Sequence, residues 1–467
     1  MTGGRDVERK RIVVVGMGYA GIPVALSLAV TGKWDVTGID VLKQKVESLN
    51  RGELPLRGKE PHLPQMLQKC LHDGTFRATT DFSPVEDAYA VLINVQTPVD
   101  EMGVPNYTHL KAAAEGVGRH LRSGTLVILE STVAPGTTEG VLKPILERAS
   151  GLSCPKDFLL AYSYERVMVG RLVHNLKNYP RIVGGVNEES TERAVEIYRS
   201  IVSAEILTSD ILTAEVAKTV ENAYRDVNIA FANEVALLCE SLGVDAYRVR
   251  ELVNSLPYDP SQPHANPIRN MHIPGAGVGG HCLPKDSLLL IYSARSSGRF
   301  EVDAPLMSLS RRLNDYMPVH MFRLAKAALK RAGVDIAGAR VTVLGYAFLQ
   351  DSDDPRNSPA ESFIKLMLFS GAGVKVHDPF VSEDSVPKGA IFTRDLEEAL
   401  KGSDLAVIFT AHSVYRDIDP RQMKGLMRRA VVVDGRALFR GKESELEDAG
   451  VLYISLGRGD TLLDITP

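Results

Sequence analysis

One cysteine of this chain lies in surroundings that suit covalent chemistry. Cys282 follows the run 275–280, which contains four glycines, and Lys285 and Asp286 follow it within four residues. A nearby cation stabilises the thiolate form of cysteine, which is the form that acts as a nucleophile. Glycines also let a backbone fold closely around a ligand. These features predict that Cys282 is a nucleophile.

A lysine and an asparagine form a second candidate pair. Lys218 and Asn222 are four positions apart in a long helical segment, so their side chains share one helix face. Polar groups that point inward from a mostly apolar helix are costly unless a polar site receives them. We expect the pair to face such a site. The alternative is a structural lysine that caps a loop carbonyl.

A glycine-rich turn near the start of the chain predicts a dinucleotide site. The segment Gly16-Met17-Gly18-Tyr19-Ala20-Gly21 follows an aliphatic strand-like run and opens a helical one, and Asp40 lies 19 residues beyond Gly21. In this pattern the first glycine makes a tight turn, the second admits a pyrophosphate and the third lets helix and strand pack closely. The alternative is a glycine-rich turn in an α/β fold that binds no nucleotide.

The residues at the end of the second strand favour NAD as the cofactor. Asp40 would accept hydrogen bonds from the adenosine ribose hydroxyls, and its charge would repel the 2′-phosphate of NADP. Val41 and Leu42 offer no guanidinium to accommodate that phosphate. NAD is therefore expected over NADP.

Alternating runs predict the elements that position these residues. Strands are expected at 12–15, 35–39, 91–95 and 125–129, with a helix at 22–30, and again at 340–344, 374–376, 405–409 and 431–433, with a helix at 359–370. Such alternation is typical of parallel sheets covered by helices on both faces. The predicted fold class is α/β, with two Rossmann-like, doubly wound parallel-sheet domains joined by a long central helix.

That central helix is expected at 210–242, with Gly243 as its stop. It is apolar around much of its circumference, which is typical of a helix buried between domains or subunits. We expect a homodimer through it. The predicted domains are 1–208, which binds NAD, 209–325, which is helical and carries Cys282, and 326–467, which is again Rossmann-like.

Composition excludes several classes of protein. The 467 residues are 44% hydrophobic and 24% charged with a net charge of −4, which gives no basic footprint for nucleic acid. No stretch approaches the roughly 20 apolar residues of a membrane span, and residues 1–11 contain no apolar export segment. Cys70, Cys154, Cys239 and Cys282 form no C-x-x-C pair, which predicts free thiols, a cytoplasmic location and no metal site.

From about Arg11 to about Phe439 the chain resembles the UDP-glucose/GDP-mannose dehydrogenase family. The matching motifs are Gly16 to Gly21, Gln96-Thr97-Pro98, Glu130-Ser131-Thr132-Val133, Tyr164-Glu165-Arg166, Lys218 with Asn222, Gly279 to Asp286, Asp353 to Pro359 and Asp434-Gly435-Arg436. The resemblance implies oxidation of a sugar C6 alcohol to the carboxylate, with two NAD per UDP-sugar. It also implies that the third domain binds the UDP-sugar.

The resemblance implies a role for each residue. Cys282 would carry a thiohemiacetal and then a thioester, and Lys218 and Asn222 would stabilise the oxyanion. Asp286 and Thr132 would position water, and Glu165 would act as acid and base in the hydrolytic stages. The implied cofactor contacts are Gly16, Gly18, Tyr19, Ala20, Gly21, Asp40, Thr97, Pro98, Thr132, Lys285 and Arg356. The implied substrate contacts are Glu165, Arg166, Lys218, Asn222, Arg269, Gly279, Leu283 and Arg436.

Departures from the family pattern indicate which UDP-sugar is the substrate. Val169 replaces a glutamate found in many members, Leu349 replaces a substrate-contacting lysine, and Leu283 replaces the Phe of UDP-glucose enzymes. His281 before the cysteine resembles the UDP-N-acetylmannosamine and UDP-N-acetylglucosamine branch. Small apolar side chains at Val278 and Leu283 would leave room for a 2-acetamido group. We therefore expect a UDP-N-acetylhexosamine, with UDP-glucose as the alternative.

Two more distant classes compete with this interpretation. A two-electron β-hydroxyacid dehydrogenase also uses Lys and Asn four apart on a long helix, but it needs no cysteine and has no second α/β domain. A non-catalytic NAD-sensing protein would not need Cys282, Lys218, Asn222 and Thr132 together. The presence of all these features favours the nucleotide-sugar dehydrogenase.

Overall fold

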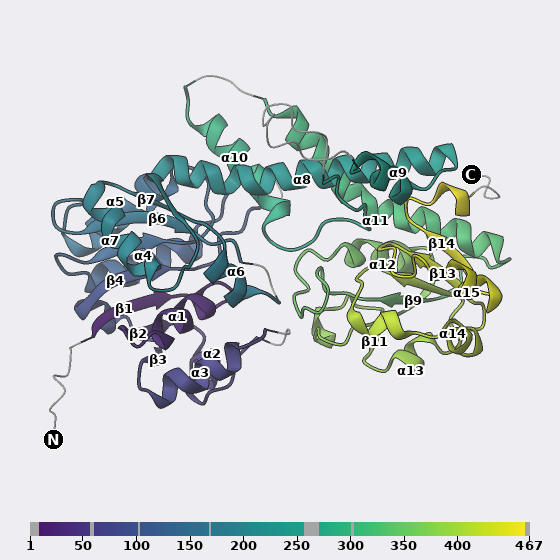
Figure 1. The fold of residues 1–467 in the computed structure, drawn as a ribbon, viewed down its shortest axis with the longest axis horizontal. Coiled ribbons are helices and arrows are strands. Elements are labelled where there is room, and N and C mark those ends of the chain that lie inside the picture. Colours follow the sequence, from purple (N-terminus) through teal and green to yellow (C-terminus); the bar gives the residue numbers. More distant parts are fainter. Residues whose placement is uncertain are drawn as a thin grey trace. The chain divides into compact units, whose positions relative to one another are not determined.

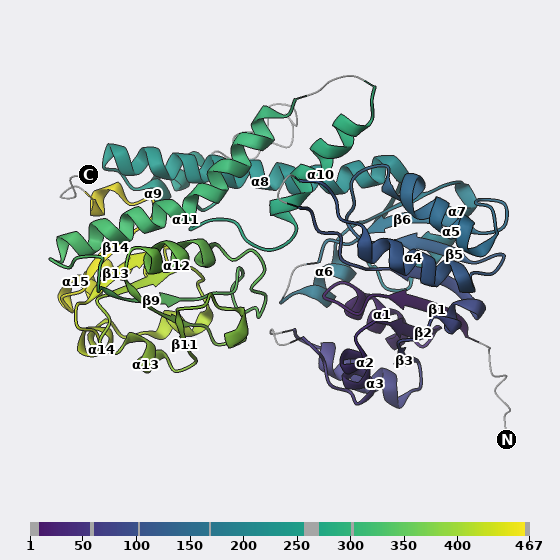
Figure 2. The same cartoon turned by 180° about the vertical axis from the view of Figure 1, so that it is seen from behind.

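The computed structural model describes residues 9–56, 60–100, 103–167, 170–255, 270–299 and 303–462. The chain divides into two compact units, Met1–Asn222 with Lys285–Asp303 and Ala223–Pro284 with Ala304–Pro467. Two helices have residues in both units, α8 (Ile211–Leu242) and α10 (Leu283–Ser296). Each unit has its own twisted sheet with helices on both faces (Figures 1 and 2).

The first unit contains an eight-stranded sheet in the order β3-β2-β1-β4-β5-β6-β7-β8. The central order, 3-2-1-4-5-6, is that of a Rossmann fold. All described pairs are parallel except β6 with β7, where the predicted parallel sheet is wrong. The strands are β1 (Lys10–Val15), β2 (Trp34–Ile39), β3 (Phe76–Thr79), β4 (Ala88–Ile93), β5 (Leu126–Leu129), β6 (Leu159–Tyr164), β7 (Arg181–Gly185) and β8 (Ile206–Asp210).

Both faces of this sheet are buried because successive strand residues enter opposite cores. In β1, Ile12 and Val14 belong to one core and Val13 and Val15 to the other. The first core also contains residues of α1 (Gly21–Val30), α2 (Lys43–Asn50), α3 (Leu63–His72), α6 (Leu172–Asn178) and α7 (Glu188–Arg199). The second contains residues of α4 (Thr108–His120), α5 (Lys143–Ser150) and the first turn of α8.

The second unit contains a six-stranded, fully parallel sheet in the order β11-β10-β9-β12-β13-β14. The strands are β9 (Arg340–Leu344), β10 (Gly373–His377), β11 (Ile391–Thr393), β12 (Leu405–Ile408), β13 (Val431–Asp434) and β14 (Leu452–Ser455). Residues of α11 (Pro305–Arg331) and α12 (Pro359–Phe369) pack into one core, and residues of α13 (Leu396–Leu400), α14 (Pro420–Leu426) and α15 (Glu443–Asp448) into the other. The unit also contains α9 (Ala246–Val253).

The predicted α/β class and central helix are confirmed. Helix α8 begins one residue after the predicted start, and Gly243 ends it with a φ of +70°. The sequence analysis missed six strands, which are short or lie toward the sheet edges: β3, β6, β7, β8, β11 and β14. No helix in the described parts of the chain is long and apolar enough to cross a bilayer.

Candidate active site

The nucleotide turn between β1 and α1 needs glycine at its first and third positions. Gly16 has a φ of +96°, and a Cβ there would lie 2.2 Å from the Asn94 carbonyl oxygen. A Cβ on Gly21 would lie 1.9 Å from the Gly16 oxygen, whereas one on Gly18 would meet nothing within 4 Å. The open space above Gly18 fits its predicted role of admitting a pyrophosphate.

Asp40 directly follows β2 and is hydrogen-bonded to this turn. Its Oδ2 accepts from the Met17 amide at 3.0 Å and its Oδ1 from the Leu42 amide at 3.0 Å. Val41 and Leu42 are exposed, whereas Asp40 itself is buried, and its contact with a ribose stays a prediction. The sequence analysis missed Lys45, whose Nζ donates to Asp40 Oδ2 at 2.8 Å. This cation reduces the negative charge that was expected to repel a 2′-phosphate.

Lys218 and Asn222 lie on the same face of α8 but have different partners. The buried Nζ of Lys218 donates to the main-chain oxygen of Glu165 at 3.0 Å and lies 5.1 Å from the ring centroid of Tyr164. Asn222 donates from Nδ2 to Asp286 Oδ2 at 2.5 Å. The carbonyl contact considered as the alternative role of Lys218 is therefore present, and it is made to a predicted catalytic residue.

Asp286 connects the first turn of α10 to α8. Its buried carboxylate accepts from Asn222 and, at 2.8 Å, from the Nζ of Lys285. Lys285 is itself buried. The amine that was expected to stabilise a thiolate and contact the cofactor is thus paired with its neighbouring carboxylate in this structure.

Glu165 and Arg166 follow β6 directly. The Oε2 of Glu165 accepts from the Val167 amide at 2.6 Å. Arg166 donates from Nε to Glu221 Oε2 at 2.9 Å and from Nη1 to the Pro180 oxygen at 2.9 Å. Glu221, which the sequence analysis left outside the site, is a partner of a predicted substrate contact.

Thr97 and Thr132 are joined through a single hydrogen bond. Thr97 Oγ1 donates to the main-chain oxygen of Thr132 at 2.5 Å, which brings two predicted cofactor-binding segments together. Pro98 follows Thr97, and Tyr19 and Ala20 are half-buried in the turn before α1. These placements are consistent with the predicted contacts, which remain predictions.

A buried carboxylate that the sequence analysis missed holds the segment that follows Thr132. Glu215 accepts at Oε2 from the Gly136 amide at 2.5 Å, and at Oε1 from the Thr138 amide at 2.9 Å and hydroxyl at 2.6 Å. Glu215 is three residues before Lys218, so it lies on the same face of α8. Burial raises the pKa of its carboxyl to about 7, against the three hydrogen bonds, which lower it.

In the second unit, Cys282 is half-buried and its Sγ lies 3.3 Å from the Nε2 of His281. The sequence analysis used His281 only to compare branches of the family. A Cβ on Gly279 would lie 2.5 Å from the Cβ of Phe348 and 2.8 Å from the Asn357 oxygen. The glycines therefore allow a close approach to protein atoms, and the expected approach to a ligand stays a prediction.

Two of the predicted arginine contacts of this unit are described, and both have partners within the unit. Arg356 forms a bidentate pair with Asp354 through Nε and Nη2. Arg436 donates from Nε to the Phe409 oxygen at 2.7 Å, and burial lowers its pKa. Leu283 is half-buried at the start of α10. Arg269 and Val169 lie outside the described residues.

Comparison with known proteins identifies the family. Sequence models of the UDP-glucose/GDP-mannose dehydrogenase family match three parts of the chain: the NAD binding domain at 10–202, the central domain at 212–316 and the UDP binding domain at 342–441. The chain belongs to this family and is an NAD-binding nucleotide-sugar dehydrogenase. The matched UDP binding domain sets it apart from the two-electron class considered above, which has no second α/β domain.

Similar proteins cover almost the whole chain. UDP-N-acetyl-D-mannosamine dehydrogenase of Pyrococcus horikoshii is 36% identical over 452 residues, which are 96% of this chain and 100% of the relative. The structure of NDP-N-acetyl-D-galactosaminuronic acid dehydrogenase from Methanosarcina mazei Go1 is 41% identical with a TM-score of 0.81 over 97% and 96% of the two chains. A UDP-glucose dehydrogenase structure from Pyrobaculum islandicum is 29% identical with a TM-score of 0.83 over 98% and 100%.

Cofactor preference should depend on both Asp40 and Lys45. Asp40→Gly should narrow the preference for NAD over NADP, because it removes the charge that repels a 2′-phosphate. Lys45→Met should widen it, because it removes the neighbouring cation. The measurement is kcat/KM for each cofactor. Equal or better use of NADP by the unaltered enzyme would refute the basis of this prediction.

Glu215 should make stability depend on pH. Its pKa is raised from about 4.5 to about 7, so its stabilising contribution is complete below about pH 4 and is lost as the pH rises through about 7. Relative to Glu215→Gln, the free energy of unfolding of the unaltered protein should fall by roughly 2 to 3 kcal/mol between pH 5 and pH 8. The exposed Glu192→Gln, which is distant in sequence and not among the groups that shift this pKa, serves as the control. Parallel stability curves for the unaltered protein and Glu215→Gln would contradict the assignment.

Proposed function

We propose that this dehydrogenase oxidises the C6 alcohol of a UDP-N-acetylhexosamine to the carboxylate through a covalent adduct on Cys282. The balanced reaction consumes the alcohol, two NAD⁺ and one water, and it yields the carboxylate, two NADH and three protons. NAD supplies the hydride acceptor in both oxidations. The observation that carries the proposal is the Cys282 thiol, 3.3 Å from the His281 ring nitrogen and directly before α10.

The protein's part in the first oxidation is to take up the C6 hydroxyl proton as the hydride leaves. We assign this proton to Glu165, by way of water, since its carboxylate follows β6 beside Arg166. The aldehyde then meets the Cys282 thiolate, and a carbon–sulfur bond forms while the aldehyde oxygen becomes an oxyanion. We assign the stabilisation of this oxyanion to Lys218 and Asn222, a cation and an N–H donor on one helix face.

The second oxidation removes the remaining C6 hydride and leaves a thioester on Cys282. Water then attacks the thioester carbon, the carbon–sulfur bond breaks and the thiolate is regenerated. Asp286 suits the positioning of this water because its carboxylate is already ordered by Asn222 and Lys285. We assign Thr132 to the same task, since its main chain is held by Thr97.

The remaining contacts follow the division of the chain into 1–208, 209–325 and 326–467, which the bounds of the three matched family models support. We propose that the first part binds NAD, the second carries Cys282 and the third binds the UDP-sugar. The proposed cofactor contacts are Gly16, Gly18, Tyr19, Ala20, Gly21, Asp40, Thr97, Pro98, Thr132, Lys285 and Arg356. The proposed substrate contacts are Glu165, Arg166, Lys218, Asn222, Arg269, Gly279, Leu283 and Arg436.

The choice of an N-acetylated sugar is supported by the relatives. The Pyrococcus and Methanosarcina proteins, at 36% and 41% identity, are both named for N-acetylated sugars. The Pyrobaculum structure, at 29% identity, is named for UDP-glucose, which makes UDP-glucose the second candidate. A hydrophobic pocket that loses contacts with one small group discriminates by only about 1 to 3 kcal/mol, so UDP-glucose is expected to be a slow substrate.

A panel of nucleotide sugars tests the substrate. UDP-N-acetylmannosamine, UDP-N-acetylglucosamine, UDP-N-acetylgalactosamine and UDP-glucose are assayed for NADH release and for NADH per sugar consumed. We expect two NADH per sugar, and a kcat/KM for at least one N-acetylated sugar about tenfold or more above that for UDP-glucose. More efficient oxidation of UDP-glucose than of all three N-acetylated sugars would end the substrate assignment.

The variant Cys282→Ser tests the covalent mechanism in the same assay. It should abolish net conversion to the carboxylate, because serine is a far poorer nucleophile at neutral pH. Cys239→Ser, at a buried thiol, is the matched substitution that should retain turnover. Conversion by Cys282→Ser that stays within a few-fold of the unaltered enzyme would refute the covalent mechanism.

We also propose that the enzyme is a homodimer through α8. Four large apolar side chains of this helix are more than half exposed, and three of them recur every seven residues: Tyr224, Phe231, Leu238 and Leu242. A seven-residue spacing keeps side chains near one helix face, and exposed apolar stripes of this kind mark contact surfaces.

Two substitutions on this stripe test the dimer. Phe231→Glu with Leu238→Glu should convert the dimer to a monomer in light scattering, because charges would be buried in an apolar contact. Exchanging Arg225, which is exposed on another side of the same helix, for Gln should leave the mass unchanged. A monomeric unaltered enzyme, or a dimer that survives the double substitution, would contradict the proposal.

A further inference from the structure

The two sheets use the same turn after their first strand. In the first unit the Gly16 amide donates to the Ile39 oxygen at 2.7 Å, and the next amide donates to Asp40. In the second unit the Gly345 amide donates to the His377 oxygen at 2.9 Å, and the next amide donates to Asp378 Oδ2 at 2.7 Å. Asp378 therefore occupies the position that binds a nucleotide ribose in a Rossmann fold.

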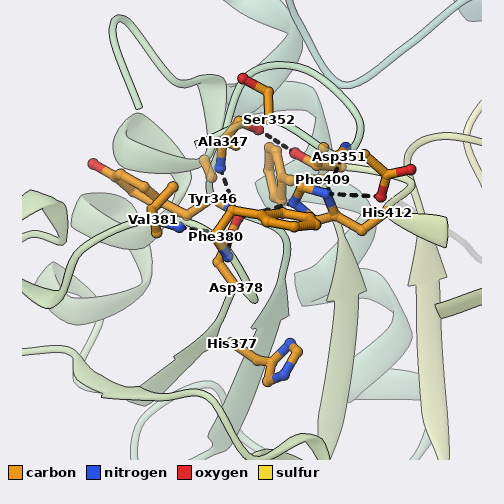
Figure 3. A network of polar contacts seen from close by, with 12 residues as sticks. Tyr346, Ala347, Asp351, Ser352, His377, Asp378, Phe380, Val381, Phe409 and His412 are labelled. Carbon is orange, nitrogen blue, oxygen red and sulfur yellow. Dashed lines mark hydrogen bonds and ion pairs between the residues drawn. The ribbon is translucent and has the colours of Figure 1, made fainter. Parts of the chain in front are cut away.

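The surroundings of this second aspartate differ from those of Asp40. Asp378 is completely buried, and its Oδ2 also accepts from the Ala347 amide at 2.9 Å and from His412 Nε2 at 3.0 Å. Its Oδ1 accepts from the amides of Phe380 at 2.9 Å and Val381 at 3.1 Å. Five donors thus enclose the carboxylate within the protein (Figure 3), which leaves it no access to a ribose.

His412 connects this carboxylate to the far end of the turn. Its Nδ1 accepts from the Asp351 amide at 2.9 Å, so the ring proton lies on Nε2 and is donated to Asp378. Asp351 has a φ of +54°, in the left-handed region, and its carboxylate accepts from the amide and hydroxyl of Ser413. The segment 346–351 is therefore held at both ends: the Tyr346 amide donates to Asp378, and the Asp351 amide donates to His412 (Figure 3).

The segment held in this way lies against the glycines that precede Cys282. A Cβ on Gly279 or Gly280 would come within 2.5 Å or 2.9 Å of Phe348, in the middle of the segment. The Gly280 amide donates to the Arg356 oxygen at 2.9 Å, and its oxygen accepts from Asn357 Nδ2 at 2.8 Å. The 279–280 backbone is thus hydrogen-bonded to residues 356–357 and packs against Phe348 of the segment.

We propose that Asp378 and His412 form a positioning pair. His412 occupies the place where a ribose would bind to Asp378, and together the two side chains fix the 346–351 segment, which supports the backbone before Cys282. The inference rests on the proposed role of Cys282 in the reaction. His412 touches no reacting atom, so it acts through Phe348 and the glycines. Burial alone would raise the pKa of Asp378, but the hydrogen bond from His412 and the amides bring it to about 2.

The test compares His412→Leu with His377→Leu. His377 is also buried and also loses two hydrogen bonds, to the Tyr415 hydroxyl and the Arg394 oxygen, but its ring points away from the segment (Figure 3). The readouts are the rate of alkylation of Cys282 by iodoacetamide, followed by peptide mass spectrometry, and kcat. The alkylation rate requires no substrate, so it reports on the pair even if the proposed reaction is wrong.

We expect His412→Leu to change both readouts by about tenfold or more: the alkylation rate should shift and kcat should fall. Small displacements of a reacting group carry penalties of this size. His412→Gln, which can still donate to Asp378, should recover most of both, and the KM for NAD should not change. Phe348→Ala, which leaves the pair intact, should reproduce the effect and replaces His412→Leu if that variant does not fold. Changes within twofold for both His412→Leu and Phe348→Ala, or an equal effect of His377→Leu, would overturn the proposal.

Discussion

At the carboxyl ends of the parallel strands, buried carboxylates accept hydrogen bonds from the main-chain N–H groups of the loops. Asp40 holds the nucleotide turn, Asp378 the equivalent turn of the second sheet, and Glu215 the segment after Thr132. Asp434 does the same beyond β13, where it accepts from the amides of Arg436 and Phe439. An ionised acceptor bonds an amide more strongly than a carbonyl does, so one side chain can fix a loop that belongs to no sheet.

The balance between burial and donors decides the charge of each carboxylate. Asp378 and Glu215 are both fully buried, and burial alone raises both pKa values. Asp378 has four amides and His412 as donors, and its pKa falls to about 2. Glu215 has two amides and one hydroxyl, and its pKa rises to about 7. The buried carboxylate is therefore permanently charged at Asp378 in the second unit, whereas the one at Glu215 in the first unit titrates near neutral pH.

Local sequence predicts what depends on local contacts. The turn from Gly16 to Gly21, the start and stop of α8 and the shared face of Lys218 and Asn222 all follow from spacing, and the structure has them where expected. Strands such as β7 and β8 escape prediction because each has only two aliphatic residues followed by glycines or polar residues, and because they lie toward one edge of the sheet. A short run carries little periodicity, and its pairing is decided by the rest of the sheet.

The partners of charged side chains are less predictable, because they come from distant parts of the chain. Glu215 reaches Gly136 and Thr138 from almost 80 residues away, and nothing in the local sequence around Glu215 identifies them. Lys45, in contrast, is only five residues from Asp40, and its pairing could have been considered from the helical spacing after β2. The local sequence therefore indicates a partner for Lys45 but none for Glu215.

The glycines before Cys282 meet a requirement that the sequence alone does not reveal. They suggested a backbone folded around a ligand, yet each described close approach is to the protein. A Cβ on Gly275 would lie 2.5 Å from the Arg436 guanidinium, and one on Gly279 would lie 2.5 Å from Phe348. The glycine run therefore packs against a half-buried arginine at one end and an aromatic ring at the other. A side chain that follows such a run needs few contacts of its own to be positioned, because the backbone before it has little freedom to move.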